Sequence, residues 1–189
     1  MKRIRTEPRL PKSGNAALAA GALIQAALGA VFVVAGLSKV VAPDYIEQFK
    51  AFVEGSAGGP SFIVQALIMR DVQLAAQLAR FTELIAGAVL LLGALEVARR
   101  RLSGPIGAQH GYEPLVALVS AAAAFVLGGL SLSIYVLQGG RLPSVNPDLA
   151  FVSPIAVELL LVPLAVGVAW IELARFVALR SSHSHAAPV

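Results

Sequence analysis

The chain lacks cysteine and is poor in charge. With no Cys among its 189 residues, it cannot form disulfides, Cys-ligated zinc sites, iron–sulfur clusters or a thiol active site. Charged residues make up 14% of the chain and hydrophobic residues 57%, whereas a soluble domain carries roughly 25% charged residues. So few charges cannot cover a water-facing surface. The composition excludes soluble, disordered and fibrous proteins, and the mean hydropathy of +0.77 indicates a membrane protein.

Histidine is also scarce, and no long apolar stretch contains one. The three histidines are His110, in a polar loop, and His183 and His185, near the C-terminus. We therefore expect no haem or chlorophyll ligated by an intramembrane His. The sequence has no phosphate-binding loop, GxSxG or HExxH motif. These gaps predict that the chain's own side chains bind no metal and no cofactor.

Four apolar stretches predict the fold class, an all-α integral membrane four-helix bundle. A helix needs roughly 20 apolar residues to cross a bilayer. A basic N-terminal extension (1–14) precedes the membrane domain (15–180), and a tail (181–189) follows it. The first stretch is too long for a signal peptide, so we expect it to be a retained span. The predicted spans cover residues 16–41, 75–96, 114–137 and 149–174.

The first loop between spans contains a further helical pattern. In Ser61–Gln77 the apolar residues recur at helical spacing, but Arg70 and Asp71 in the middle make the segment too polar to span. We expect an interfacial helix that continues into, or bends into, the second span. Gly55–Pro60 separates this helix from the helical piece before it.

The positive charges predict the orientation. Ten of the 15 lysines and arginines flank one set of span ends, and the positive-inside rule places those ends in the cytoplasm. Both termini and the 96–114 loop then lie inside, in a protein of the cytoplasmic (inner) membrane. The net charge of +4 is thus an orientation signal, and we expect no nucleic-acid partner. The ten are Lys2, Arg3, Arg5, Arg9, Lys12, Arg99, Arg100, Arg101, Arg175 and Arg180.

Charges within the spans are the candidate site, because they are costly in a membrane. Lys39, Arg80, Glu83 and Glu158 all fall in the predicted outer half, as does Tyr135. Arg80 and Glu83 are three residues apart and share a helix face. Glu83 and Glu158 are the candidate proton-transfer residues, and Glu158 is expected to be the deepest. Lys39, Arg80 and Tyr135 are candidates for quinone binding or a polar network.

Two interpretations of these residues stay open. In the first, they form a polar pocket that hydrogen-bonds a quinone carbonyl or relays a proton. In the second, the ion pairs fix the register between spans, and Lys39 reaches the membrane surface. At the inner ends, Glu96 with Arg99 and Glu172 with Arg175 are interpreted as an ordinary cytoplasmic boundary.

Two segments resemble the DoxX/DoxD-like family of membrane proteins. GAVFVVAGLSKVVAPDYIEQF (Gly29–Phe49) is similar to the family's opening helix and its exit, and ELIAGAVLLLGALEVARR (Glu83–Arg100) is similar to its second helix. The informative matches are Gly36, Lys39 and Glu83. The resemblance implies a four-helix membrane protein linked to respiratory-type redox complexes, of which the thiosulfate:quinone oxidoreductase membrane subunits are the best known.

Three functions follow as expectations. The first is a DoxX-like membrane subunit of a redox or energy-transducing complex, with a contribution to quinone binding. The second is a non-catalytic accessory subunit that packs against partner transmembrane helices or pigments. The third is a small transporter, against which no inverted repeat is visible. The expected surroundings are the lipid bilayer and other subunits of a membrane complex.

Overall fold

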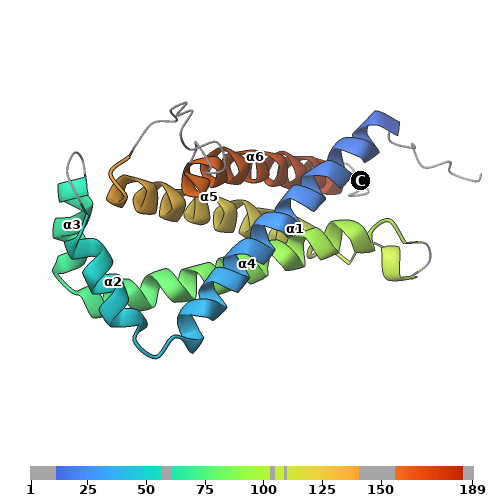
Figure 1. The fold of residues 1–189 in the computed structure, drawn as a ribbon. Coiled ribbons are helices and arrows are strands. Elements are labelled where there is room, and N and C mark those ends of the chain that lie inside the picture. The colour runs from blue at the N-terminus through green and yellow to red at the C-terminus, as the bar shows by residue number, and fades with distance from the viewer. Residues whose placement is uncertain (1–11, 57–60, 103–104, 109, 141–155, 185–189) are drawn as a thin grey trace, which may run out of the picture.

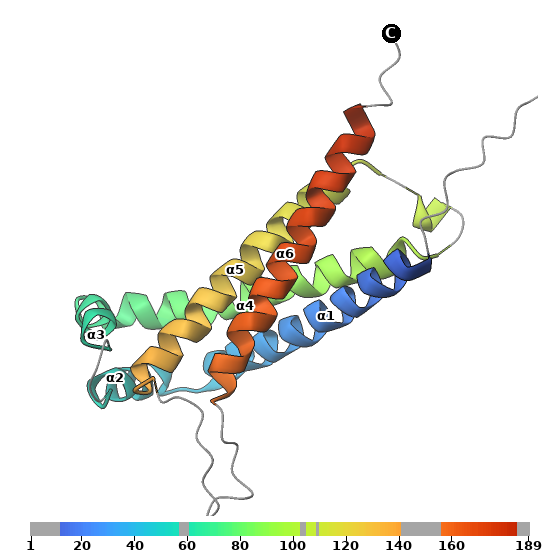
Figure 2. The same cartoon turned by 90° about the horizontal axis from the view of Figure 1, so that it is seen from above.

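Helices account for nearly all of the described chain. The computed structural model describes residues 12–56, 61–102, 105–108, 110–140 and 156–184, and no strand occurs in these ranges. Figures 1 and 2 show the arrangement from two directions. The elements are α1 (Lys12–Val41), α2 (Tyr45–Glu54), α3 (Ser61–Met69), α4 (Val72–Arg99), the short 3-10 helix η1 (Pro105–Gly107), α5 (Glu113–Leu137) and α6 (Val157–Ser184).

Four of these helices are long and apolar enough to cross a membrane. They are α1 from Ala16, α4, α5, and α6 to Ser181, with 25 to 28 residues each. The prediction of an all-helical protein with four span-length helices is confirmed. Each helix is longer than the roughly 20 residues that a span needs, so the helix ends extend beyond the hydrocarbon or tilt within it.

The long helices form two antiparallel hairpins that pack as two crossing layers (Figure 2). The most extensive contacts join α1 with α4 and α5 with α6, and α4 contacts α5 across the centre. Of the most apolar part of each helix, 39% in α4 and 44% in α5 is buried, against 28% in α1 and 17% in α6. Helices α4 and α5 therefore form the middle of the bundle, and α6 is its most exposed span.

Small residues let the helices of the first hairpin approach closely. A Cβ atom on Gly29 would lie 2.8 Å from the Gly87 carbonyl oxygen, and one on Gly36 would lie 2.7 Å from Leu84 Cγ. Tight contact of this kind replaces the hydrophobic effect as the main source of attraction between helices in lipid. The central core then combines small and large side chains. It includes Leu28, Phe32, Ala86, Leu90, Ala124, Leu127, Ala165 and Val168.

The segment between α1 and α4 folds into two short helices at one end of the bundle. Helices α2 and α3 lie on either side of the glycine-rich stretch, as the two predicted helical pieces do. The helical segment after this stretch does not continue into the second span. It breaks at Arg70 and Asp71, and the Asp71 carboxylate caps α4 by accepting a hydrogen bond from the Leu74 N–H at 2.9 Å.

The fourth long helix covers the described part of the predicted span and continues beyond its end. Residues 149–155 of the predicted span, like the N-terminal residues 1–11 and the tail 185–189, lie outside the described residues. The described helix begins at Val157 and extends to Ser184, ten residues beyond the predicted end at 174. It can continue because no Gly or Pro follows Gly167 within α6.

Candidate functional site

One end of the bundle holds a buried ion pair between the helices of the first hairpin. Lys39, in the last turn of α1, places its Nζ 2.6 Å from a Glu83 carboxylate oxygen on α4. The side chain of Glu83 is 2% exposed, whereas that of Lys39 is 28% exposed. The close approach at Gly36, one turn before Lys39, brings the ammonium within reach of α4. One partner is thus enclosed, and the other remains open to its surroundings.

Tyr45 of α2 lies near enough to Glu83 of this pair to feel its charge. Its ring is buried, and its hydroxyl donates a hydrogen bond to the Ala76 carbonyl at 3.3 Å. Burial, together with the negative charge of Glu83, raises the pKa of Tyr45 to about 12, against a smaller opposing effect of Arg80. Tyr45 is therefore a neutral phenol at physiological pH.

Arg80 lies against the same aromatic residue. Its guanidinium carbon is 5.9 Å from the Tyr45 ring centroid and 5.1 Å from that of Phe81, within cation–π range. The Arg80 side chain also donates a hydrogen bond to Gln77, while its Nε is buried without a hydrogen-bond partner among the described residues. We refer to Lys39, Tyr45, Arg80 and Glu83 as the Lys39 cluster.

The structure brings together three of the five predicted site residues, and the other two lie on the helices of the second hairpin. Glu158 lies in the first turn of α6 and accepts a hydrogen bond from Gln138 of α5 at 3.1 Å. It is half-buried, so Glu83 and not Glu158 is the deeply enclosed glutamate of this end. The expectation that Glu158 is deepest is wrong, because the described helix begins only one residue before it. Tyr135 is buried in the last turns of α5.

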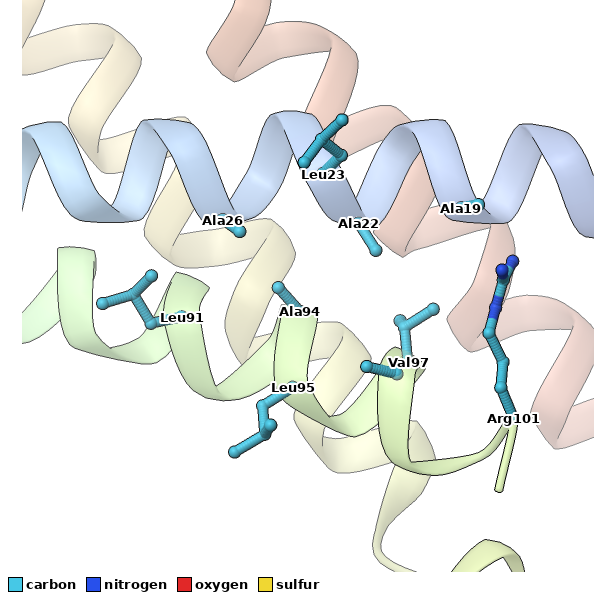
Figure 3. A pocket seen from close by; sticks show the side chains of 10 residues that line it. Ala19, Ala22, Leu23, Ala26, Leu91, Ala94, Leu95, Val97 and Arg101 are labelled. Atoms are coloured by element: carbon cyan, nitrogen blue, oxygen red, sulfur yellow. The ribbon is translucent and has the colours of Figure 1, made fainter. Parts of the chain in front are cut away.

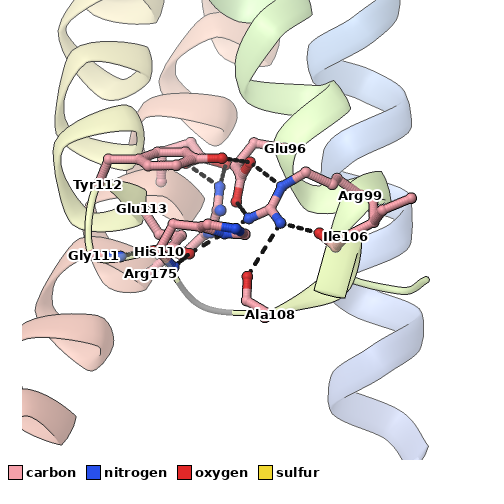
Figure 4. Close-up of polar contacts among 10 residues, drawn as sticks. Glu96, Arg99, Ile106, Ala108, His110, Gly111, Tyr112, Glu113 and Arg175 are labelled. Atoms are coloured by element: carbon pink, nitrogen blue, oxygen red, sulfur yellow. Dashed lines mark hydrogen bonds and ion pairs between the residues drawn. The ribbon is translucent and has the colours of Figure 1, made fainter. Parts of the chain in front are cut away.

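The other end of the bundle holds a larger buried network that the sequence reasoning missed (Figure 4). Glu96 is 6% exposed, Glu113 1% and Glu172 2%, and they come from α4, α5 and α6 respectively. Glu96 and Glu172, which the sequence analysis interprets as boundary residues, are thus buried inside the bundle. We refer to Glu96, Arg99, Tyr112, Glu113, Glu172 and Arg175 as the Arg99 cluster.

Arg99 is the centre of this network. Its guanidinium binds Glu96 through two hydrogen bonds, of 2.7 and 2.8 Å, and lies 3.4 Å from a Glu113 oxygen. It also donates to the carbonyls of Ile106 and Ala108 in the loop between α4 and α5. A bidentate Arg–carboxylate pair is among the strongest polar contacts in proteins. Arg99 therefore joins α4, α5 and their connecting loop.

The remaining members are also paired. Glu113 accepts hydrogen bonds from the backbone N–H groups of His110 and Gly111 at 2.6 and 2.8 Å. The Tyr112 hydroxyl donates to Glu96 at 3.3 Å. On α6, Arg175 lies 3.1 Å from Glu172, with one guanidinium nitrogen buried and unpartnered among the described residues. Such pairing is what a structural network requires.

One signal in the sequence points to this network. The same pattern, Glu-x-Ala-Arg, occurs as Glu96–Arg99 at the end of α4 and as Glu172–Arg175 in α6. Spacing by three residues places each pair on one helix face. Because both copies of the pattern lie at the same end of the bundle, they differ from basic residues that are scattered along a membrane boundary. Within the described residues, no group of three or more His, Asp and Glu side chains is arranged to hold a metal ion.

Between the two clusters, Gln25 makes a polar contact from one helix to another. Gln25 of α1, 1% exposed, donates a hydrogen bond to the Leu90 carbonyl of α4 at 3.1 Å. Gly93 leaves the space that Gln25 and Ser120 fill, since a Cβ atom there would overlap both side chains. A polar side chain in an apolar helix commonly makes such a hydrogen bond to a neighbouring helix.

No family model, no curated protein and no solved structure matches this chain. Its function is therefore inferred from the chemistry of the two clusters. The Lys39 cluster combines a half-open ammonium with an enclosed carboxylate, which can donate to a carbonyl and exchange a proton. The Arg99 cluster consists of groups already engaged with one another.

Proposed function

We propose that the chain is a DoxX-like integral membrane subunit of a larger redox or energy-transducing complex, and that its Lys39 cluster contributes to quinone binding. The observation that carries the proposal is the unequal exposure of one ion pair. Lys39 is 28% exposed and Glu83 2%. A quinone carbonyl beside α1 could accept a hydrogen bond from the Lys39 ammonium. Glu83 could then exchange a proton with the quinone through Lys39.

The resemblance of Gly29–Phe49 and Glu83–Arg100 to DoxX/DoxD-like helices supports this role. Lys39 and Glu83, the two charged residues among the informative matches to that family, form the ion pair. Tyr45 and Arg80 then act as positioning residues, because their contacts run to Ala76, Gln77 and each other.

Substitution of Glu83 tests this role. Glu83→Gln keeps the shape of the side chain but removes its charge, and we expect quinol-dependent electron transfer in membranes of the native host to fall about 100-fold. Glu47→Gln is the matched control, because Glu47 is an exposed glutamate of α2. Full turnover by a Glu83→Gln protein present at the normal level would refute the quinone role.

We place the protein in the cytoplasmic membrane with both termini and the Arg99 cluster on the inner side, and with α2 and α3 along the outer surface. The basic residues that flank the Arg99 end support this orientation. Because the chain has no cysteine, single substitutions can report the sides directly. An impermeant thiol reagent applied to intact cells should label Glu54→Cys and leave Ser181→Cys unlabelled. The reverse pattern would invert the topology.

A second candidate is a non-catalytic accessory subunit, and the exposure of α6 favours it. Only 17% of the most apolar part of α6 is buried, and Trp170 is 75% exposed. A partner helix could cover this face. The test is cross-linking in native membranes from a photoreactive residue at position 170, with position 78 of α4, where Leu78 is 58% exposed, as the control. A cross-link to lipid alone would rule out a partner on this face.

A further inference from the structure

A groove lies on the second hairpin, where the beginning of α5 packs beside the C-terminal part of α6 (Figure 2). Its volume is about 590 Å³, within the roughly 300–1,000 Å³ typical of small-molecule sites. It is at the same end of the bundle as the Arg99 cluster, since Glu113 and Arg175 are close neighbours of its residues in the sequence. Six residues line it: Gly111, Pro114, Leu115, Leu118, Phe176 and Arg180.

The lining changes from polar to apolar along the helix axes. Helix α5 enters the bundle at Glu113, so Leu118 lies about 6 Å further into the bundle than Pro114. Helix α6 runs in the opposite direction, so Phe176 lies about 6 Å further in than Arg180. The groove therefore has a positive charge toward the end of the hairpin and hydrocarbon further in.

The apolar part of the groove is open to the surrounding lipid. Leu115 and Leu118 are 62% and 41% exposed, and the ring of Phe176 lies across from them on α6. Apolar walls on both sides suit a flexible hydrocarbon chain, which gains dispersion contacts that a flat helix surface does not offer.

Arg180 carries a charge that no carboxylate neutralises among the described residues. Its guanidinium carbon lies 5.5 Å from the Phe176 ring centroid. A cation–π contact of this kind orients a guanidinium but leaves its charge and its N–H donors in place. The preceding acidic residue of α6, Glu172, is paired with Arg175, and none of the six described residues that line the groove is acidic. The positive charge of Arg180 therefore remains able to attract an anion.

A second groove, between α1 and α4, lacks this combination (Figure 3). The charged residue in its lining, Arg101, already has an interaction partner. Nothing in that lining selects one headgroup over another, so the groove between α1 and α4 is an internal reference for the one at Arg180. Its walls are formed largely by Ala19, Ala22, Ala26, Ala94 and Ala98.

A charge beside an apolar wall is complementary to an anionic amphiphile. We infer that the groove between α5 and α6 binds an anionic phospholipid, with the phosphate at Arg180 and an acyl chain along Phe176 and Leu118. A guanidinium recognises a phosphate through charge-assisted hydrogen bonds, and basic residues beside transmembrane helices attract anionic headgroups. The inference is independent of the quinone role and requires only that the second hairpin lies in a bilayer.

Photolabelling of the full-length protein tests the site. The protein is reconstituted in phosphatidylcholine vesicles that contain a trace of either phosphatidylglycerol or phosphatidylcholine with a photoreactive acyl chain, and the labelled peptides are mapped. We expect the ratio of phosphatidylglycerol to phosphatidylcholine labelling to be about fivefold higher in segments 111–118 and 173–180 than in segments 19–26 and 91–98. This is the effect of one basic residue on an anionic headgroup. Equal ratios at the two grooves would overturn the inference.

Substitutions of Arg180 separate its charge from its packing on Phe176. Arg180→Gln should abolish the phosphatidylglycerol preference, whereas Arg180→Lys, which keeps a positive charge, should retain most of it. Arg70→Gln is the matched control, because Arg70 is an exposed arginine at the opposite end of the bundle. An unchanged preference in Arg180→Gln, or an equal loss in Arg180→Lys, would refute the site.

Two further outcomes would identify another occupant. Competition by excess glycerol 3-phosphate would show that the site takes the phosphate without the acyl chain. Labelling that falls as the protein-to-lipid ratio rises would show that a second copy of the chain covers the groove. Either result overturns the assignment to a phospholipid, which predicts labelling that glycerol 3-phosphate and protein density leave unchanged.

Discussion

The two ends of the bundle both enclose charged side chains between helices, but they differ in how completely those charges are paired. At one end, a single ion pair joins α1 to α4, and its lysine remains 28% exposed. At the other, Arg99 with the nearly inaccessible Glu96 and Glu113 joins α4, α5 and the connecting loop, and the enclosed Glu172 pairs with Arg175 within α6. The Arg99 cluster has its polar groups largely engaged with one another, as a structural junction does. The Lys39 cluster retains an open donor, as a ligand-binding site does.

The largest expected effect lies in the Arg99 cluster and tests whether it is structural. Arg175→Leu leaves the enclosed Glu172 carboxylate without its partner and should destabilise the protein by about 3–5 kcal/mol. Arg180→Leu, at an exposed position of the same helix, is the control. Unfolding in mixed micelles with a denaturing detergent measures both. Equal stabilities would show that the network contributes no more than a surface charge does.

The second effect concerns the Lys39–Glu83 pair. Lys39→Met strands the Glu83 carboxylate and should cost about 3 kcal/mol, whereas Lys39→Met combined with Glu83→Leu should return close to the wild-type stability. The same unfolding assay completes this double-mutant cycle. Additive losses would mean that the two residues act separately, and the contrast between the two ends would no longer hold.

The third prediction concerns the close approach that allows the pair to form. Gly36→Ala places a Cβ atom 2.7 Å from Leu84 Cγ and should cost about 2 kcal/mol by forcing α1 away from α4. Gly129→Ala is the matched control, since both glycines precede Leu-Ser and nothing lies within 4 Å of a Cβ atom on Gly129. The control should be neutral or slightly stabilising. Equal losses would show that helix propensity, not packing, governs both positions.

The smallest effect concerns the buried phenol of the Lys39 cluster. Tyr45→Phe removes one hydrogen bond to Ala76 and should cost about 1 kcal/mol. Because the pKa of Tyr45 is raised to about 12, its contribution is fully present below pH 10, the ordinary value, and is lost as the pH rises toward 12. Stability measured across this range should fall more steeply in the wild type than in Tyr45→Phe. Parallel profiles would contradict the buried phenol.

The four long helices could be predicted from the sequence, because the length and hydropathy of a span are local properties. It also indicated that Lys39, Arg80 and Glu83 lie at one end. It misplaced Glu158, because the depth of a residue depends on where its helix begins. The true first residues of α4 and α6 were not visible in hydropathy alone.

The Arg99 cluster could not be predicted in the same way. Whether Glu96 and Glu113 are buried depends on how the loop between α4 and α5 folds back, since Arg99 binds the carbonyls of Ile106 and Ala108. Tyr45 was missed for a related reason. Its burial depends on the packing of α2 against α4, a tertiary contact between segments about thirty residues apart.

Helix α4 contributes residues to both clusters, and this fixes the distance between the two clusters along the bundle. Glu83 and Glu96 are separated by 13 residues on one continuous helix, which corresponds to about 20 Å along its axis. The hydrocarbon core of a typical bilayer is about 30 Å thick. The Lys39 cluster and the Arg99 cluster are thus closer together than the two surfaces of the hydrocarbon core. The bilayer must thin around the bundle, or Lys39 and the arginines must draw water and headgroups inward to meet them.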